Sequence, residues 1–281
     1  MSEIWTIRRV LDWTKSYLAE KGVENARLET EWLLSAALGR DRVGLYVSLD
    51  QPLNPDELAV CREFVTRRAK REPLQYILGT QEFYGLDFVV TPAVLIPRHD
   101  TEVIVEESVL RVPGARAVLD IGVGSGCIAV ALAKNLPDAQ VCGVEQSPEA
   151  LSLAQKNAER HGVRVTLFEG SLFEPFVGQH FDLIVSNPPY IPTADLDTLQ
   201  PEVREFEPLQ ALDGGPDGLH FYRLIVPAAP EHLVPGGWLL REIGIGQADA
   251  VLGMRERAGF GESFTAKDPN GIERVVGGKV P

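Results

Sequence analysis

Cysteine is scarce in this sequence and is nowhere clustered. The chain of 281 residues has three cysteines, Cys61, Cys127 and Cys142, which lie far apart and form no C-x-x-C pair. Disulfide frameworks and structural zinc sites need paired or closely spaced thiols. The cysteines therefore argue against both, and we expect the protein to work in a reducing cytoplasm.

Histidines are also few, and none has the spacing of a metal-binding helix. The sequence contains neither H-x-x-x-H nor H-E-x-x-H, the patterns that place two imidazoles on one helical face. We expect each histidine to be a surface or capping residue, and the sequence predicts no metal site. The five are His99, His161, His180, His220 and His232.

Long hydrophobic runs are missing as well. No stretch approaches the roughly 18–20 consecutive apolar residues of a membrane span. Charged residues from Arg8 to Lys15 interrupt the N-terminal stretch, which does not read as a signal peptide. We therefore expect a soluble protein with no membrane partner.

An excess of positive charge is missing too, because the net charge is −13. Proteins that grip nucleic acids through many phosphates are usually basic on the binding face. The one basic run, "TRRAKRE" at residues 66–72, falls in the last turns of a predicted helix, where cations complement the helix dipole. We expect no direct binding of nucleic acid.

The first 74 residues predict a small helical domain. The second predicted helix covers residues 26–38 and closes at Gly39, and the third has Asn54 as its N-cap and Pro55 in its first turn. The first helix has apolar residues at helical spacing. They are Ile4, Ile7, Leu11 and Leu18.

The remainder predicts an α/β domain. Residues 75–97 alternate aromatic and β-branched residues around Gly85, which predicts a hairpin linker. Strand and helix patterns then alternate over residues 98–281, which is typical of a mostly parallel sheet with helices on both faces. The last two predicted strands follow each other directly, which indicates an antiparallel edge.

A glycine-rich turn follows the first strand of this domain. In "DIGVGSG", Gly122, Gly124 and Gly126 allow a tight turn and a close approach of a ligand to the backbone. Such a turn is a weak signal by itself, because it also serves simply to join a strand to a helix. Asp120 at the strand end either accepts from a cofactor ammonium group or holds the loop.

Two further strand ends carry candidate ligand-binding residues. Glu145 ends the next strand, about twenty residues past the glycines, where a carboxylate accepts from ribose hydroxyls. Leu172 follows the third strand, and an adenine ring can pack there, although ordinary core packing also explains a leucine. Together with the glycines, these residues favour a nucleoside cofactor without identifying it.

The fourth strand ends in "NPPY", Asn187 to Tyr190. Prolines stop a strand and make a rigid loop at the sheet edge where ligands bind. The Asn187 side-chain oxygen and the Pro188 carbonyl can accept from the N–H groups of a planar amine or amide, with Pro189 keeping the loop rigid. Tyr190 offers a face on which a flat group can stack.

"DIGVGSG", Glu145 and "NPPY" resemble the class I methyltransferases, which have a Rossmann-like fold and use S-adenosylmethionine. "PLQYILGTQEFYGLDF", "VLIPRHDTE" and "FEPLQALDGGPDGL" more closely resemble the release-factor glutamine methyltransferases, the PrmC/HemK family. The resemblance covers nearly the whole chain. The matching cofactor positions are Asp120, Gly122, Val123, Gly124, Ser125, Gly126, Glu145, Leu172 and Asn187.

The resemblance implies a specific reaction. Members of this family methylate the side-chain amide nitrogen (N5) of the glutamine in the Gly-Gly-Gln motif of peptide chain release factors. Asn187, Pro188, Pro189 and Tyr190 match the glutamine site, with Asn187, Pro188 and Tyr190 in the catalytic role. The helical domain would dock the release factor, and we expect a monomer.

Some positions depart from the family pattern, and other functions stay open. Relatives commonly have proline at His99, aspartate at Glu145 and Ser171, and an aromatic residue at Leu172, so adenine packing is expected to be looser. The alternatives are methylation of a glutamine in a ribosomal protein, amine methylation of a nucleic-acid base, and a non-catalytic cofactor-binding module. The acidic charge argues against the second.

Overall fold

The computed structural model describes residues 4–281, which form two compact units. One contains the residues up to Gly79 together with Gln200–Phe206, and the other contains Thr80–Leu199 and Glu207–Pro281. The first boundary falls after residue 79 because residues 74–78 are helical and Ile77 is buried in the helical core, whereas the sequence predicts a linker from residue 75.

The first unit is helical, as predicted. Ile7, Leu11 and Leu18 are buried in its core, but Ile4 is 70% exposed because the first helix begins only after Thr6, its N-cap. Ile4 therefore lies outside the helix that its spacing predicts. The helices are α1 (Ile7–Glu20), α2 (Ala26–Leu38), α3 (Arg42–Val47), α4 (Pro55–Ala69), α5 (Leu74–Leu78) and α9 (Pro201–Phe206).

The predicted helix ends of this unit are confirmed. Gly39 ends α2 with a left-handed φ of 60°, a conformation that glycine adopts without a Cβ penalty. Asn54 accepts from the Glu57 backbone N–H, and the Glu57 side chain accepts from the Asn54 N–H, forming a capping box at α4.

The basic run of α4 is engaged in ion pairs. Arg67 pairs with Glu72 at 2.6 Å. Arg68 is 4% exposed and pairs with Glu29 and, at 2.9 Å, with Glu202. Arg71 also pairs with Glu202, at 2.6 Å. The two pairs with Glu202 hold α9 within the helical unit, a feature that the sequence does not indicate.

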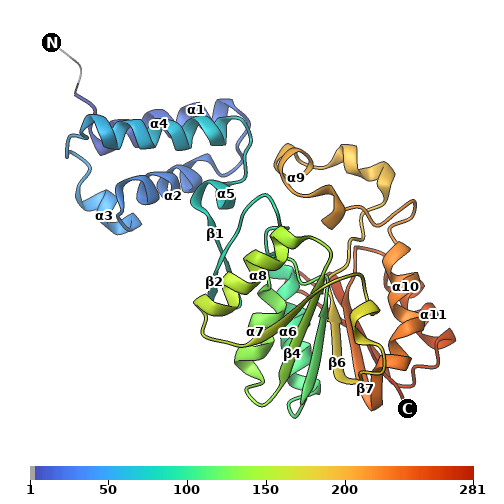
Figure 1. The fold of residues 1–281 in the computed structure, drawn as a ribbon. Coiled ribbons are helices and arrows are strands. Elements are labelled where there is room, and N and C mark those ends of the chain that lie inside the picture. The colour runs from blue at the N-terminus through green and yellow to red at the C-terminus, as the bar shows by residue number, and fades with distance from the viewer. Residues whose placement is uncertain (1–3) are drawn as a thin grey trace. The chain divides into compact units, whose positions relative to one another are not determined.

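The second unit contains a two-stranded sheet and a seven-stranded sheet (Figure 1). The strands are β1 (Thr80–Phe83), β2 (Leu86–Val89), β3 (Ala117–Ile121), β4 (Gln140–Glu145), β5 (Val165–Glu169), β6 (Phe181–Ser186), β7 (Leu233–Glu242), β8 (Ser263–Lys267) and β9 (Glu273–Lys279). The large sheet has the order β5-β4-β3-β6-β7-β9-β8. Within the predicted antiparallel edge, β9 runs opposite to its neighbours β7 and β8.

Helices cover both faces of the large sheet (Figure 1). One face packs against α6 (Glu102–Arg111), α7 (Cys127–Asn135) and α8 (Pro148–Arg160). The other packs against α10 (His220–Ala228) and α11 (Ala248–Arg257). The strand order reverses between β3 and β6, and ligands bind at such a switch point, beyond the carboxyl ends of the strands.

The predicted hairpin is the pair β1 and β2. Its turn residues, Tyr84 and Gly85, both have positive φ, at 53° and 71°, as a tight two-residue hairpin turn requires. Asn157 of α8 accepts from the Val89 N–H and donates to the Val89 carbonyl, which fastens the hairpin to α8. The hairpin therefore belongs to the second unit.

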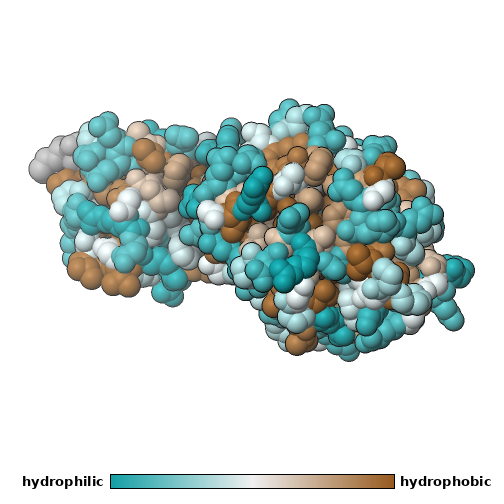
Figure 2. Space-filling view, turned by 60° about the horizontal axis from the view of Figure 1, so that its bottom comes forward, coloured by the Kyte–Doolittle hydropathy of each residue, from teal (hydrophilic) through white to brown (hydrophobic). Residues whose placement is uncertain are grey.

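The surface in the view of Figure 2 is mostly hydrophilic, with apolar residues in small separate patches. Within residues 4–281, no helix has both the length and the apolar character needed to cross a bilayer.

Candidate active site

A cavity of about 560 Å³ lies at the carboxyl ends of β3, β4 and β6. This size is typical of small-molecule sites. Nine of the residues predicted from the sequence line it together: Gly122, Val123, Gly124, Ser125, Glu145, Leu172, Asn187, Pro188 and Pro189. Three others, Asp120, Gly126 and Tyr190, do not line it, and the structure places each of them against a neighbouring element.

The glycine-rich loop divides into two parts. Gly122 has a φ of 76°, and a Cβ added there would meet no atom within 4 Å, so a side chain would extend into open space at the cavity. Gly126 is the N-cap of α7, and a Cβ there would lie 3.2 Å from the Cα of Ala154 in α8. Gly122 thus leaves room for a ligand, whereas Gly126 allows two helices to approach.

Asp120 lies beneath this loop rather than in the cavity wall. Its side chain is 1% exposed, and its Oδ2 accepts from the Ala129 backbone N–H at 3.1 Å. Burial, reinforced by the negative charge of Glu145, raises the pKa of Asp120 to about 7. Asp120 therefore holds the start of α7 from below.

Glu145 is held in place by backbone donors. Its Oε2 accepts from the Gly124 N–H at 3.1 Å, and its Oε1 accepts from the N–H groups of Gln146 and Ser147 at 2.8 and 3.1 Å. Each carboxylate oxygen can accept further hydrogen bonds. Glu145 therefore presents a fixed acceptor at the cavity wall, beside the glycine-rich loop.

The loop after β5 places Leu172 in the cavity wall. Leu172 has a φ of 50°, an uncommon value for a residue with a side chain. Ser171, next to it, does not line the cavity, and its hydroxyl accepts from the Gln146 side-chain amide at 3.0 Å. Of these two positions, only Leu172 contributes to the cavity wall.

The "NPPY" loop begins at a tie between two strands. The buried Ser186 hydroxyl donates to the Ile121 carbonyl at 2.8 Å, which joins the ends of β6 and β3. Asn187 follows, and its side-chain amide donates to the Thr101 hydroxyl at 3.3 Å. Pro188 and Pro189 continue the cavity wall.

Tyr190 faces away from this wall. Its hydroxyl donates to Glu242 Oε1 at 3.2 Å, and a Cβ at Gly244 would lie 3.1 Å from its ring. The Gln247 side-chain amide donates to its carbonyl at 3.0 Å. Burial and the charge of Glu242 raise the pKa of the Tyr190 hydroxyl. A stacking role for this ring stays a prediction.

Two family models match the chain. Residues 9–79 match the PrmC N-terminal domain, and residues 100–200 match the methyltransferase small domain. The release factor glutamine methyltransferase of Geobacter sulfurreducens is 80% identical over 278 residues, which are 99% of this chain and 98% of that protein. That of Moorella thermoacetica is 46% identical, covering 90% of this chain and 91% of that protein. The chain belongs to the release factor glutamine methyltransferase family.

Solved structures support the fold of this family member. A methyltransferase from Pyrococcus furiosus matches 70% of this chain and 89% of its own, with a TM-score of 0.53 and 21% identity. The 16S rRNA N2 G1207 methyltransferase of T. thermophilus, solved with AdoMet and guanosine, matches 72% of this chain and 50% of its own, with a TM-score of 0.52 and 19% identity. At these identities the likeness shows a class I methyltransferase fold.

The structure adds cavity residues that the motif analysis did not assign. Arg98 lines the cavity and pairs with Glu207 at 2.5 Å, while Glu207 Oε2 accepts from the Ile96 N–H at 3.3 Å. Both partners come from stretches that the sequence singled out through resemblance alone, "VLIPRHDTE" and "FEPLQALDGGPDGL". The further lining residues include Thr101, Pro208, Leu209, Gln210, Phe221 and Ile225.

Glu242 was also missed, although a signal for it existed. It ends β7, the strand beside β6, and thus occupies the same kind of position as Glu145 on β4. The strand-end rule that identified Glu145 would have selected it.

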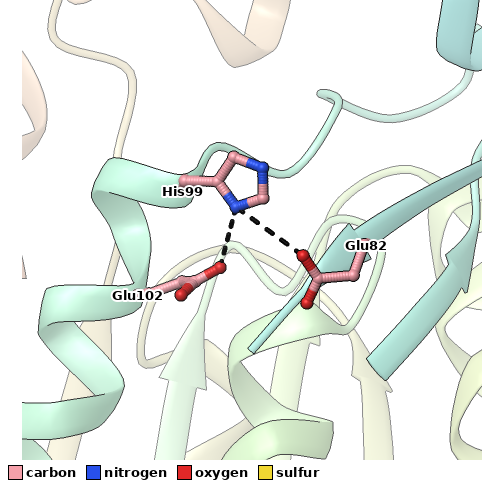
Figure 3. A group of neighbouring side chains, drawn as sticks. All are labelled: Glu82, His99 and Glu102. Carbon is pink, nitrogen blue, oxygen red and sulfur yellow. Dashed lines mark hydrogen bonds and ion pairs between the residues drawn. The ribbon is translucent and has the colours of Figure 1, made fainter. Parts of the chain in front are cut away.

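His99 lies outside the cavity, between two carboxylates (Figure 3). Its Nδ1 is 2.9 Å from Glu102 Oε1 and 4.0 Å from Glu82 Oε2. The same Glu102 oxygen accepts from the Tyr84 N–H, and Glu82 accepts from the Gly85 N–H, so both carboxylates fasten the hairpin turn. This is the grouping with metal-ligand spacing within residues 4–281. The expected lack of a metal stays a prediction.

Proposed function

We propose that this protein transfers a methyl group from S-adenosylmethionine to the side-chain amide nitrogen of the glutamine in the Gly-Gly-Gln motif of peptide chain release factors. One observation carries the proposal. A single cavity contains the fixed acceptor Glu145, the open glycine-rich loop and the acceptors of Asn187 and Pro188. The near full-length identity to the Geobacter sulfurreducens enzyme supports the substrate.

The residues present fit S-adenosylmethionine, which supplies an electrophilic methyl group on a sulfonium when bound. Gly122 leaves open space at the cavity, and Glu145 presents oxygens that can accept from ribose hydroxyls. Leu172 offers an apolar surface for adenine. We propose that these residues, with Val123, Gly124 and Ser125, hold the cofactor.

Asn187 and Pro188 act on the substrate side. An amide nitrogen is a poor nucleophile because its lone pair is delocalised into the carbonyl. The Asn187 side-chain oxygen and the Pro188 carbonyl would accept from its two N–H groups and hold it in place while its lone pair takes the methyl group, with the sulfonium S–C bond breaking to leave a neutral thioether. As the N–H groups become more acidic, the two dipoles stabilise the growing positive charge, and one proton then leaves to water.

The helical unit is proposed to dock the release factor. Large aromatic side chains anchor many protein interfaces, and Trp13, Trp32 and Tyr46 are between 45% and 50% exposed in this unit. We further propose that the protein acts as a monomer in the cytoplasm and does not bind nucleic acid directly. The ion pairs of Arg67, Arg68 and Arg71 support the last point.

The test is to incubate the purified protein with S-adenosylmethionine and the release factor of its own organism, and to locate any added methyl by peptide mass spectrometry. One methyl on the Gly-Gly-Gln glutamine is expected. A release factor with alanine in place of that glutamine is the matched control. An unmethylated release factor, with cofactor binding intact by calorimetry, would refute the proposed substrate.

A further inference from the structure

Glu242 is a buried carboxyl group beneath the "NPPY" loop. It is the last residue of β7 and is 1% exposed, and it does not line the cavity. Its Oε2 is buried without a hydrogen-bond partner among the described residues. A buried carboxylate is costly, so its presence calls for a physical reason.

Two hydroxyl groups act on this carboxyl group, that of Tyr190 at the end of the motif and that of Thr101. The Tyr190 hydroxyl donates to Oε1 at 3.2 Å. The Thr101 hydroxyl also interacts with the carboxyl group, and this interaction lowers the pKa of Glu242 against the effect of burial. Thr101 is 2% exposed, so water does not compete freely for its hydroxyl.

Thr101 also binds the first residue of the motif. The Asn187 side-chain Nδ2 donates to Thr101 Oγ1 at 3.3 Å. A threonine hydroxyl has one proton. When the hydroxyl donates this proton in a hydrogen bond to a carboxylate, its oxygen can only accept a hydrogen bond from its other neighbour. Which end of an amide is nitrogen follows from such a network, and here the network assigns the NH₂ group to Thr101.

We propose that Glu242 is a positioning residue that fixes the orientation of the Asn187 amide through Thr101. Its negative charge orients the Thr101 hydroxyl to donate a hydrogen bond to the carboxylate. Thr101 can then only accept from the Asn187 NH₂ group, so the Asn187 oxygen remains available to the N–H of the substrate glutamine. The same carboxylate holds Tyr190, so both ends of the motif depend on one charge. The proposal rests on the proposed methylation of a glutamine amide.

Loss of the charge has a defined consequence. Without a carboxylate to bind, the Thr101 hydroxyl can donate to the Asn187 oxygen instead. The Asn187 amide then turns its NH₂ group toward the cavity. There it faces the N–H groups of the substrate, and because both are hydrogen-bond donors, no hydrogen bond forms between them. The glutamine nitrogen loses its acceptor, while the glycine-rich loop and Glu145 are unaffected.

Other ionisable groups around Glu242 act on its protonation. Arg274, ion-paired with Asp100 at 2.6 Å, favours the charged form, whereas Asp100 opposes it. The Tyr222 hydroxyl donates to the Glu242 backbone carbonyl at 2.9 Å, and the buried Cys127 thiol also feels the charge. Burial has the largest effect and raises the pKa of Glu242 to about 7.

The main experiment uses Glu242→Gln in the full-length protein, which keeps the side-chain volume and removes the charge. The turnover number with the release factor is expected to fall at least about tenfold, a loss on the scale of one displaced transition-state acceptor. The dissociation constant for S-adenosylmethionine, measured by calorimetry, should change less than about twofold. Affinity for a Gly-Gly-Gln peptide without cofactor should weaken.

The pH profile separates positioning from packing. Wild-type turnover should fall as the pH drops through about 7, because Glu242 takes up a proton, and Glu242→Gln should lack this limb. Asp120 titrates in the same range but lies under the cofactor loop, so its protonation should appear in cofactor affinity instead.

Thr101 supplies the matched pair of variants. Thr101→Val removes the hydroxyl at nearly the same side-chain volume, leaves Tyr190 as the donor to Glu242, and should reproduce the loss of turnover. Thr101→Ser keeps the hydroxyl and should restore most of it. Adding Thr101→Val to Glu242→Gln should cause little further loss, because both break the same chain of hydrogen bonds.

Unchanged turnover in Glu242→Gln would overturn the proposal, and so would a cofactor affinity that falls in parallel with turnover. Equal turnover in Thr101→Val and Thr101→Ser would also overturn it. If the wild-type protein leaves the release factor unmethylated, the proposed substrate fails instead. The two failures are therefore distinguishable.

Discussion

The two halves of the cavity are held by different means. On the cofactor side, Glu145 accepts from backbone N–H groups of Gly124, 21 residues away, and of its two immediate successors. On the substrate side, Asn187 depends on Thr101, 86 residues away, and Tyr190 on Glu242, 52 residues away. Local backbone fixes the first half, and buried side chains from distant parts of the chain fix the second.

The difference has a physical reason. Cofactor recognition needs a tight loop and a fixed acceptor, which a short stretch of chain can supply. In the substrate half, the groups that hydrogen-bond Asn187 and Tyr190 are side chains from distant segments. The substrate half therefore relies on tertiary structure, and variants in the two halves should separate turnover from cofactor binding.

The largest effect is expected at Asn187. Asn187→Ala removes one acceptor for the glutamine N–H and should reduce turnover on the order of 10²-fold or more. Steady-state kinetics with the release factor measure it, and calorimetry should find cofactor affinity nearly unchanged. Equal losses of turnover and of cofactor affinity would show that Asn187 binds the cofactor, and would contradict the division of the cavity into two halves.

Glu145→Ala should have the opposite signature. The variant loses a charged acceptor, which is worth about 1.5–3 kcal/mol, so the dissociation constant for S-adenosylmethionine should rise roughly 10- to 100-fold. Turnover at saturating cofactor should fall much less. Titration calorimetry checks the first part, and an unchanged dissociation constant would contradict the acceptor role.

Two glycines of one loop sharpen the comparison further. Gly122→Ala puts a methyl group into open space at the cavity and should weaken cofactor binding. Gly126→Ala forces a Cβ against Ala154 and should mainly lower the melting temperature, by roughly 2–4 °C per kcal/mol.

Gly162→Ala is the control for these two variants, because Gly162 has a φ of 63° and no atom within 4 Å of an added Cβ. This variant measures the cost of placing a residue with a Cβ in a left-handed backbone conformation, without any steric contact. Identical cofactor affinity in all three variants would show that Gly122 does not face the ligand.

The smallest expected effect concerns stability and pH. Because the folded pKa of Asp120 is about 7, above its ordinary value near 4, the folded state binds more protons than the unfolded state between these values. Stability should therefore decrease as the pH rises through this window, and Asp120→Asn should reduce the decrease. Thermal melts between about pH 5 and 8 measure the effect. Parallel curves for both proteins would contradict it.

Much of the fold follows from local patterns. Asn54 and Gly39 mark helix ends by side-chain or backbone chemistry that acts over a few residues, and both are confirmed. Ile4 was wrongly assigned because periodicity does not show where a helix begins. Residues 75–78 fall in the predicted linker although they are helical, because a five-residue helix has too little pattern to detect.

The candidate site divides in the same way. Gly122, Glu145 and Asn187 could be found because each ends or directly follows a strand whose carboxyl end lies at the cavity. Glu242 could be selected as a strand-end residue, but its pairing with Tyr190 could not be predicted, since nothing local indicates which way the Tyr190 ring turns. The ion pairs of Glu202 depend on contacts with Arg68 and Arg71, more than a hundred residues away.

The place of α9 bears on attempts to cut the protein into separate parts. A fragment that ends at Gly79 would lack Glu202, and the buried Arg68 would keep Glu29 as its remaining carboxylate partner. A fragment that starts at Thr80 would carry a short helix whose acidic side chain has lost both arginines. Truncation after Gly79 therefore leaves charged groups without their partners in both products.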